Sequence, residues 1–362
     1  MTLIITFLGK GGTGRTTTAI AVAKKLARLG SRVLLMGQDL SLGFLLGTSL
    51  TSTATEVEPN LSAVQLSSTA LLEQGWEQIK ELESKYLRSP TLKNVYGQEL
   101  GVIPGMDEIL TLNAFREYSQ SGRYDVILYD GAGNLNSLRM LGVPEIGSWY
   151  WRRFRQVLQD SDVVKTVMPF LQPIASAVLN VSWNFDQLSQ EPQNPENLLS
   201  EGIKALTDPN RFAAYLVTTT DPAAILVAKS LWGGAQQVGL SVRGVIANTK
   251  GIAAEFSPEF NPLITTTLPN FSGDNWDELI NAVPDVRSTS NVPQPLTIDI
   301  AARQVQVFLP GFDKKQVKLT QYGPEITIEA GDQRRNIALP SPLSGQPVKG
   351  AKFQNGYLII SF

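Results

Sequence analysis

Short apolar runs alternate with segments of helical periodicity along most of the chain. The apolar runs predict buried strands at residues 3–8, 31–36, 61–66, 124–129, 211–218 and 241–247. Between several of these runs, apolar residues recur at helical spacing, as in residues 17–29 and 223–238. Because strands that alternate with helices pair in parallel, we expect an α/β fold with a doubly wound, mostly parallel sheet.

The pattern changes to a period of two after residue 295. Six short runs predict strands at residues 296–300, 305–309, 317–319, 326–328, 336–339 and 357–360, with no long helix between them. This arrangement is typical of a small all-β sandwich. The sequence therefore predicts a large domain at residues 1–280, a linker at 281–295 and a β-sandwich at 296–362.

A glycine-rich segment joins the first predicted strand to the first predicted helix. Its residues are Gly9, Lys10, Gly11, Gly12, Thr13, Gly14, Arg15, Thr16 and Thr17. Glycines let backbone N–H groups approach phosphate oxygens, and the N-terminal end of the helix favours the same negative charge. The Thr16 hydroxyl stands where it would ligand Mg²⁺. We therefore expect a phosphate-binding loop; the alternative is an ordinary turn.

Two positions depart from the usual phosphate-binding loop. Lys10 is an additional lysine early in the loop, and Arg15 stands before Thr16, where lysine is usual. Arginine keeps the positive charge, but its guanidinium group is larger and forked. We expect both cations to stabilise phosphate charge.

Three polar side chains follow predicted strands, on the edge where open α/β sheets bind ligands. They are Asp39, Asp130 and Asn248. Asp39 would place an attacking water or hold a water of Mg²⁺, and Asp130 would hold Mg²⁺ through water. The Asn248 amide would read an adenine base. The alternatives are a helix cap for Asp39 and turn residues for the other two.

The composition narrows the chemistry further. The 31 basic and 33 acidic residues give a formal net charge of −2, without a long basic run, which argues against a nucleic-acid partner. The chain has no cysteine and no histidine, so thiolate nucleophiles, histidine catalysis and Cys/His zinc sites are excluded. With no apolar run of about 18 residues and no evident signal peptide, we expect a cytoplasmic protein without stable membrane insertion.

Residues 138–185 are rich in apolar and aromatic side chains, among them Trp149, Tyr150, Trp151 and Phe154. One interpretation is that they form helices buried against the sheet. The other is an adaptable surface for apolar ligands, because aromatic and flexible apolar side chains suit such surfaces. The sequence leaves both open.

Residues 1–270 resemble the ATPase family of the arsenite-pump ATPase and of the ATPase that guides tail-anchored proteins to membranes. The resemblance is carried by GKGGTGRTT, LSAVQL, PGMDEIL, YDVILYDGAG followed by SLRML, and SVRGVIANT. It implies a homodimer that uses ATP and Mg²⁺, with Lys10 reaching the partner's nucleotide. It also implies that Asp39, in a first switch, helps activate water, that Asp130 opens a second switch and that Asn248 contacts adenine.

The chain departs from that family at two kinds of position. Its first switch reads Asp39-Leu40-Ser41, where the family has proline and histidine after the aspartate. The cysteines that bind zinc or arsenite in family members are missing. We therefore expect neither a zinc-linked dimer nor arsenite transport.

Residues 296–362 are similar to the α-crystallin domain of small heat-shock proteins. The matching strings are VFLPGFDKKQVKL, ITIEAGDQRRNIALP and AKFQNGYLIISF. Only a few residues separate Ile328 from Ile337, too few for that family's long dimerisation loop, and no tail with an assembly motif follows. We expect no large oligomers. The two resemblances together imply the branch of the targeting-ATPase family with a fused C-terminal α-crystallin domain.

Three functional hypotheses follow. The first is a dimeric, ATP-driven chaperone or targeting factor for hydrophobic client segments, with a membrane receptor as a further partner. The second is a nucleotide-gated binding scaffold that scarcely hydrolyses ATP, because of Arg15 and the altered first switch. The third is the ATPase subunit of an anion pump for a substrate other than arsenite. A DNA-segregation ATPase is disfavoured because no basic patch is present, and a membrane-positioning relative because the chain ends in a predicted strand.

Overall fold

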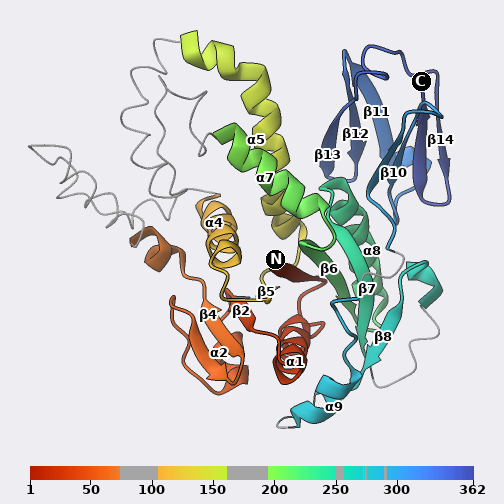
Figure 1. Cartoon of the computed structure of the whole chain (residues 1–362). Helices are drawn as coiled ribbons and strands as arrows, with labels where there is room; N and C mark the ends of the chain where they lie inside the picture. Colours follow the sequence, from red (N-terminus) through yellow and green to blue (C-terminus); the bar gives the residue numbers. More distant parts are fainter. Residues whose placement is uncertain (74–104, 161–194, 250–256, 272, 274, 289–291) are drawn as a thin grey trace, which may run out of the picture.

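The computed structural model describes residues 1–73, 105–160, 195–249, 257–271, 273, 275–288 and 292–362 (Figure 1). In the large domain the elements are β1 (Leu3–Leu8), α1 (Arg15–Arg28), β2 (Val33–Gly37), α2 (Ser41–Leu46), β3 (Thr55–Glu58), β4 (Leu61–Gln65), α4 (Met106–Gln120), β5 (Val126–Asp130), α5 (Leu135–Asp160), α7 (Pro195–Thr207), β6 (Phe212–Thr218), α8 (Pro222–Gln237), β7 (Ser241–Asn248), the 3₁₀ helix η5 (Ser257–Phe260), β8 (Thr265–Leu268) and α9 (Trp276–Ala282). In the C-terminal part they are β9 (Leu296–Asp299), β10 (Gln304–Phe308), the 3₁₀ helix η6 (Lys314–Gln316), β11 (Val317–Tyr322), β12 (Glu325–Ala330), β13 (Gln333–Ala338), β14 (Gly350–Gln354) and β15 (Tyr357–Ser361).

The large domain is built on one eight-stranded sheet in the order β3-β4-β2-β5-β1-β6-β7-β8. Strand β3 pairs antiparallel with β4, and the other neighbours pair in parallel. This confirms the predicted doubly wound, mostly parallel fold. The pattern of apolar residues did not predict β3 and β8, because their sequences, TEVE and TTTL, are short and mostly polar. Both are edge strands, which are less buried and therefore need fewer apolar residues.

Apolar cores fill both faces of this sheet. Along β1, Ile4 and Leu8 belong to the cluster that lies under α4, α5 and α8, whereas Ile5 and Phe7 belong to the cluster under α1 and α9. Successive side chains of a strand point to opposite faces, so a strand buried on both sides is apolar at nearly every position. That requirement produced the continuous runs from which the strands were predicted. It also leaves the carboxyl ends of the strands free for polar loops.

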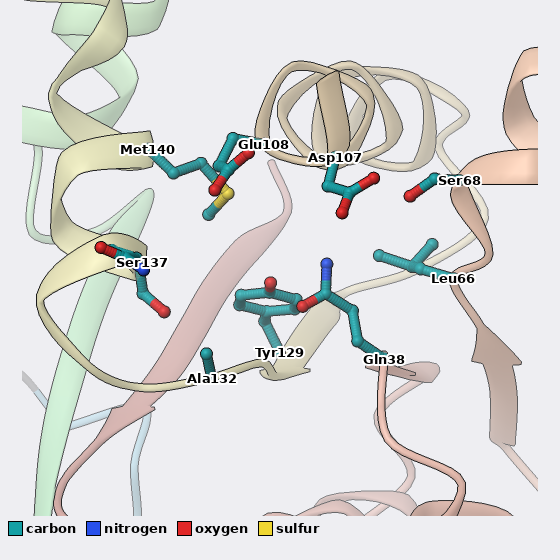
Figure 2. Close-up of a pocket in the computed structure, with 10 residues that line it drawn as sticks. Gln38, Leu66, Ser68, Asp107, Glu108, Tyr129, Ala132, Ser137 and Met140 are labelled. Carbon is teal, nitrogen blue, oxygen red and sulfur yellow. The ribbon is translucent and has the colours of Figure 1, made fainter. Parts of the chain in front are cut away.

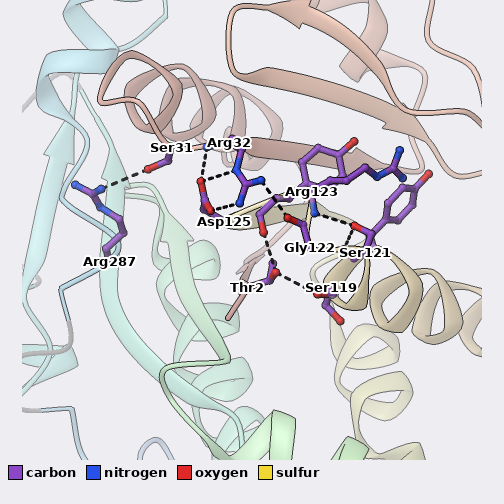
Figure 3. Close-up of polar contacts among 11 residues, drawn as sticks. Thr2, Ser31, Arg32, Ser119, Ser121, Gly122, Arg123, Asp125 and Arg287 are labelled. Carbon is purple, nitrogen blue, oxygen red and sulfur yellow. Dashed lines mark hydrogen bonds and ion pairs between the residues drawn. The ribbon is translucent and has the colours of Figure 1, made fainter.

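At the amino ends of the central strands, polar contacts hold the chain in place, as Figure 3 shows. Arg32, just before β2, holds the Asp125 carboxylate, just before β5, through Nη2 at 2.7 Å and Nε at 3.2 Å. The Thr2 hydroxyl donates to the Tyr124 carbonyl oxygen at 2.8 Å. These contacts align the starts of β1, β2 and β5, so that their other ends lie side by side. Because Arg32 and Asp125 are about half exposed, solvent screens the attraction between their charges, and the contact serves mainly to align the strands.

The C-terminal part is a two-sheet sandwich, which confirms the predicted fold class. One sheet has the order β14-β15-β10-β9 and the other β11-β12-β13. Ala330 pairs with Gln333, so only Gly331 and Asp332 connect β12 to β13. Gly331 has φ of +59°, which glycine adopts without strain. The sequence pattern missed β14, whose residues GAKFQ are mostly exposed.

The sandwich packs against α8 of the large domain. The ring of Phe308 on β10 lies 5.5 Å from that of Trp232 on α8, in an edge-to-face arrangement. A Cβ atom at Gly233 would lie 2.4 Å from the Phe312 ring and 2.5 Å from the Pro310 carbonyl oxygen. Glycine in the middle of α8 therefore lets the sandwich approach the helix backbone.

The segment after α9 contributes to the large domain. Val283 and Val286 are buried in the cluster under α1, although both lie in the predicted linker. The buried Arg243 on β7 donates to the Val286 carbonyl oxygen at 2.5 Å. In the described part of the chain, no helix is both long and apolar enough to cross a membrane.

Candidate functional site

The glycine-rich loop lies at the carboxyl end of β1, as expected for a strand–loop–helix unit. A Cβ atom at Gly9 would lie 2.1 Å from the Val217 carbonyl oxygen, so the end of β6 leaves no room for a side chain. Gly12 and Gly14 have φ of +83° and +86°, in the left-handed region that favours glycine. Gly11, by contrast, has open space where a side chain would be. The loop conformation thus depends on three of its four glycines.

Helix α1 begins at Arg15, directly after the loop, and Thr16 and Thr17 lie in its first turn. No side-chain hydrogen bond caps this end; its N-cap residue is Gly14. The first N–H groups of a helix have no partner within the helix and carry partial positive charge. An uncapped helix start behind a glycine loop is suited to hold an anion.

Asn248, at the end of β7, supports the backbone of the glycine-rich loop through its side-chain amide. Its Nδ2 donates to the Thr13 carbonyl oxygen at 2.6 Å and lies 3.3 Å from the Thr18 hydroxyl. A Cβ atom at Gly14 would lie 2.5 Å from this nitrogen. The amide therefore supports the backbone of the phosphate loop. Its predicted contact with adenine stays a prediction.

Lys10 lies at the outer side of the loop and is held by Asp221. Lys10 Nζ lies 3.3 Å from Asp221 Oδ2, and both side chains are 47% exposed. Asp221 also caps α8 by accepting from the Ala223 N–H at 3.2 Å. The Ala223 N–H, then Lys10, lower the pKa of Asp221. The sequence analysis missed Asp221, although it follows β6 as Asp39 follows β2.

Arg15 connects the phosphate loop to the loop after β5. Its Nη1 donates to the Gly131 carbonyl oxygen at 2.9 Å. Burial lowers the pKa of the Arg15 guanidinium, while Asp130 and Asp39 raise it. A Cβ atom at Gly133 would lie 1.9 Å from Arg15 Nη1, and the Gly133 carbonyl oxygen accepts from the Gly9 N–H at 2.9 Å. Residues 131–133 are thus fixed against the phosphate loop at two points.

Asp130 ends β5 beneath the first turn of α1. It is 4% exposed, and its Oδ2 has no hydrogen-bond partner among the described residues. Burial raises the pKa of this carboxyl, whereas a hydrogen bond from Thr16 and the charge of Arg15 lower it. An ionised form that lacks a partner for one oxygen suits a site completed by a cation.

Asp39 lies exposed at the end of β2, on the same edge. Its Oδ1 accepts from the Ser41 N–H at 2.7 Å. Hydrogen bonds from the Ser41 side chain and backbone lower the pKa of Asp39, so it is ionised at neutral pH. Asp39 and Asp130 both contribute to the electrostatic surroundings of Arg15. The structure therefore places Arg15, Thr16, Asp39 and Asp130 around one site.

A pocket of about 310 Å³ lies beside this site, on the side of α4 (Figure 2). Gln38 and Ala132, from the loops that carry Asp39 and Asp130, form part of its wall, and Asp107 and Glu108 of α4 point into it. Two carboxylates would repel a phosphate group. The phosphates therefore belong at the glycine loop and not in this pocket. The described residues contain no cluster of three or more His, Cys, Asp or Glu side chains that could hold a metal ion alone.

Comparison with known proteins agrees with this geometry. Residues 2–260 match the family model described as anion-transporting ATPase (ArsA), and residues 301–362 match the HSP20-like domain found in ArsA. The protein of Chlorobaculum tepidum named "Putative arsenical pump-driving ATPase" is 23% identical over an alignment of 392 positions, gaps included, which covers 99% of this chain and 95% of that protein. The ATPase GET3 of Malassezia globosa is 22% identical over 244 residues, covering 66% of this chain and 70% of that protein.

These matches cover both parts of the chain that were predicted from sequence. The first includes the glycine loop, Asp39, Asp130 and Asn248, and the second includes most of the β-sandwich. The chain belongs to the ArsA family of ATPases, with a C-terminal HSP20-like domain.

Proposed function

We propose that this ATPase is a dimeric chaperone or targeting factor, in which Mg²⁺-dependent ATP hydrolysis controls the binding of hydrophobic client segments. One observation carries the client part of the proposal. Helix α5 begins directly after the loop of residues 131–133, which follows Asp130 at the nucleotide site. The same helix bears a stripe of exposed apolar side chains. The loop and the stripe are therefore parts of one element.

The phosphate loop supplies most of the binding to the triphosphate. The uncapped backbone N–H groups at the start of α1, together with those of the loop, would bind the β- and γ-phosphates. Lys10 and Arg15 add positive charge at its two sides. Such preorganised donors stabilise the charge that develops on the transferred phosphoryl group.

The residues present fit a magnesium ion. The Thr16 hydroxyl would be a direct ligand, and Asp130, with its unpartnered Oδ2, would accept from a metal-bound water. When bound, the ion would neutralise charge on the β- and γ-phosphate oxygens. Thr16 would exchange its hydrogen bond to Asp130 for this arrangement. Asp130 would thereby sense the terminal phosphate.

Asp39 is suited to orient the attacking water. Its lowered pKa makes it a weak base, but its ionised carboxylate can accept a hydrogen bond from a water at the exposed edge of the site. Orientation is the main protein contribution to water attack in phosphoryl transfer. The Ser41 N–H fixes the carboxylate in this position.

The mouth of the site has the properties of a contact surface between two copies of the chain. Leu40 and Phe44, one turn apart beside Asp39, are more than four-fifths exposed. Lys10 is half exposed, and its ion pair with the equally exposed Asp221 is screened by solvent. A second copy that presented its own phosphates would offer Lys10 a stronger partner than Asp221.

The apolar stripe on α5 consists of Val143, Ile146 and Tyr150, which are 37%, 46% and 55% exposed. Their spacing of three and four residues places them on one face of the helix. Residues 161–185, the rest of the predicted client surface, lie outside the described residues. The described part of this region therefore supports both earlier interpretations, because Leu138 and Leu141 of the same helix are buried.

A scaffold that scarcely hydrolyses ATP is the second candidate. Arg15 stands where phosphate loops usually have a lysine that contacts phosphate. Its guanidinium instead donates to the Gly131 carbonyl oxygen, so one of its N–H groups is not available to phosphate. An anion pump is less well supported, because the chain has no cysteine with which to bind a metalloid through sulfur.

Replacing Asp39 with asparagine separates hydrolysis from binding. We expect Asp39→Asn to lower the rate of phosphate release about 100-fold, because it removes the charge that orients water, while ATP affinity changes less than threefold. Steady-state phosphate release and calorimetry with Mg²⁺-ATP measure the two quantities. Unchanged turnover would contradict the role of Asp39, and a wild-type rate at background would favour the scaffold.

Asp130→Asn tests the buried carboxylate. Burial raises the Asp130 pKa, so the folded state holds this proton more tightly than the unfolded state does. Stability therefore falls as pH rises from the ordinary aspartate pKa through the raised value. We expect Asp130→Asn to raise the unfolding midpoint of the nucleotide-free protein at pH 7 and to abolish the gain from Mg²⁺ in ATP binding. Asp277→Asn, at an exposed ion pair, is the control and should change neither. A lower midpoint would contradict the charge analysis.

Lys10→Ala tests the dimer. Two symmetric lysine–phosphate contacts of about 1.5 kcal/mol each predict a roughly 100-fold weaker nucleotide-induced dimer. Sedimentation with a non-hydrolysable ATP analogue and Mg²⁺ measures it, with Lys352→Ala on the exposed strand β14 as control. If the wild type stayed monomeric with saturating nucleotide, the proposed dimer would be wrong.

Ile146→Asp tests the client surface. A charge in the centre of the stripe should weaken binding of a 20-residue apolar helical peptide about tenfold, with ATP affinity unchanged. Fluorescence anisotropy in the presence of nucleotide measures both. Leu29→Asp, at an exposed apolar residue beyond α1 on the other face of the sheet, is the matched control. Equal losses in the two variants would argue against α5 as the client surface.

A further inference from the structure

Helix α5 makes a series of polar contacts with the β11-β12-β13 sheet of the sandwich. Arg139 forms an ion pair with Asp332, in the turn between β12 and β13. Further toward the C-terminus of α5, Arg152 lies 3.6 Å from Glu325, and the Trp149 Nε1–H donates to the same carboxylate at 3.1 Å. These partners lie at both ends of β12. The contact therefore fixes the direction of the helix as well as its distance.

Arg335 is the buried member of this interface. Its side chain, on β13, is 5% exposed, and its Nη1 donates to the Gln236 carbonyl oxygen on α8 at 3.0 Å. Its Nε lies 3.9 Å from Glu145 Oε1 on α5. A Cβ atom at Gly239 would lie 3.3 Å from Arg335 Nη2, so the end of α8 closes around the guanidinium. One side chain of the sandwich thus joins α5 to α8.

The rest of the interface is poorly matched in hydrogen bonds. Among the described residues, both amide atoms of Gln333, Trp232 Nε1, Gln236 Oε1 and Arg335 Nε itself are buried without a hydrogen-bond partner, so Arg335 meets Glu145 as an ion pair only. Unpartnered polar groups disfavour the docked state relative to water. The position of the sandwich on α5 therefore depends strongly on the charged contacts. A buried guanidinium that lost Glu145 would be especially unfavourable.

The N-terminal end of α5 lies beside the nucleotide site. Asn134 caps the helix by accepting from the Asn136 N–H at 2.9 Å and the Ser137 N–H at 3.3 Å. It follows Gly133 directly, in the loop that Arg15 and Gly9 hold. Leu138, in the first turn, is buried against Gly234 of α8. A rotation or translation of α5 on α8 would therefore move this loop.

We propose that Arg335 is a positioning residue for ATP hydrolysis, which acts from the sandwich by holding α5 on α8 and so fixes residues 131–133 beside Arg15. The sandwich is then an internal regulator of the nucleotide site. This inference rests on ATP hydrolysis by the chain but not on the proposed clients or dimer. Because coupling between binding free energies is reciprocal, a sandwich contact that raises nucleotide affinity is itself stabilised when nucleotide binds.

Arg335→Met removes the charge and keeps most of the volume. In the full chain we expect kcat for ATP to fall about tenfold and the affinity for a non-hydrolysable ATP analogue to fall about threefold, because residues 131–133 shift while the phosphate loop itself is untouched. Hydrogen exchange at residues 131–138 should accelerate at least tenfold. Glu145→Gln, which removes the negative charge that faces the buried Arg335, should have the same effects. Arg334→Met, at the exposed neighbouring position on β13, is the matched control and should leave all of these quantities unchanged.

Two results would overturn the proposal. One is an Arg335→Met protein with the kcat and the exchange rates of Arg334→Met. The other is an acceleration of exchange spread over the whole central sheet, which would mean that Arg335 contributes general stability and does not position α5.

The wild-type protein provides a test that does not depend on how the variants fold. Binding of a non-hydrolysable ATP analogue with Mg²⁺ should slow hydrogen exchange in residues 145–152 and 325–338 at least threefold. Titration of the analogue to saturation, followed by calorimetry, establishes occupancy. Unchanged exchange in both segments at full occupancy would overturn the proposal, while a failure to bind nucleotide at all would instead refute the proposed site.

Discussion

The structure depends on a short hydrogen-bonded connection between two loops at the centre of the sheet. Arg15 donates to the Gly131 carbonyl oxygen, and the Gly9 N–H donates to that of Gly133. Through these bonds the loop that would hold phosphate and the loop that opens with Asp130 become one unit. Substitution of Gly9 or Gly133 would place a Cβ atom within 2.1 Å of a neighbouring atom. The chemistry of the site and the position of α5 therefore have a common origin.

Most of the fold could be predicted because burial on both faces of the sheet imposes a simple pattern. Strands β1, β2, β5, β6 and β7 are buried along nearly their whole length and are mostly apolar, and their ends direct attention to Asp39, Asp130 and Asn248. Edge strands escaped prediction because they need no such pattern. Asp221 escaped because an aspartate before a proline is an ordinary helix cap, and only the fold shows that Lys10 lies 3.3 Å away.

The contact between the two parts of the chain could not be predicted from either part alone. Each resemblance in sequence covered one domain, and neither contains a signal for the other. The polar residues that meet there, such as Glu145 and Arg335, look like ordinary surface residues of a helix and a strand. Burial of Arg335 depends on where the sandwich lies, which is a property of the assembled chain and not of a local pattern.

Two consecutive glycines in helix α8, Gly233 and Gly234, let neighbouring elements pack close to its backbone. Gly233 and Gly234 weaken a helix interior by about 1 kcal/mol each relative to alanine. In return, they admit the Phe312 ring on one side and Leu138 on the other. A chain cut after the large domain would retain the flexible glycines and would expose the face of Trp232 to water. The two domains are thus poorly suited to independent existence, and we expect their sequences to change together where they meet at α8.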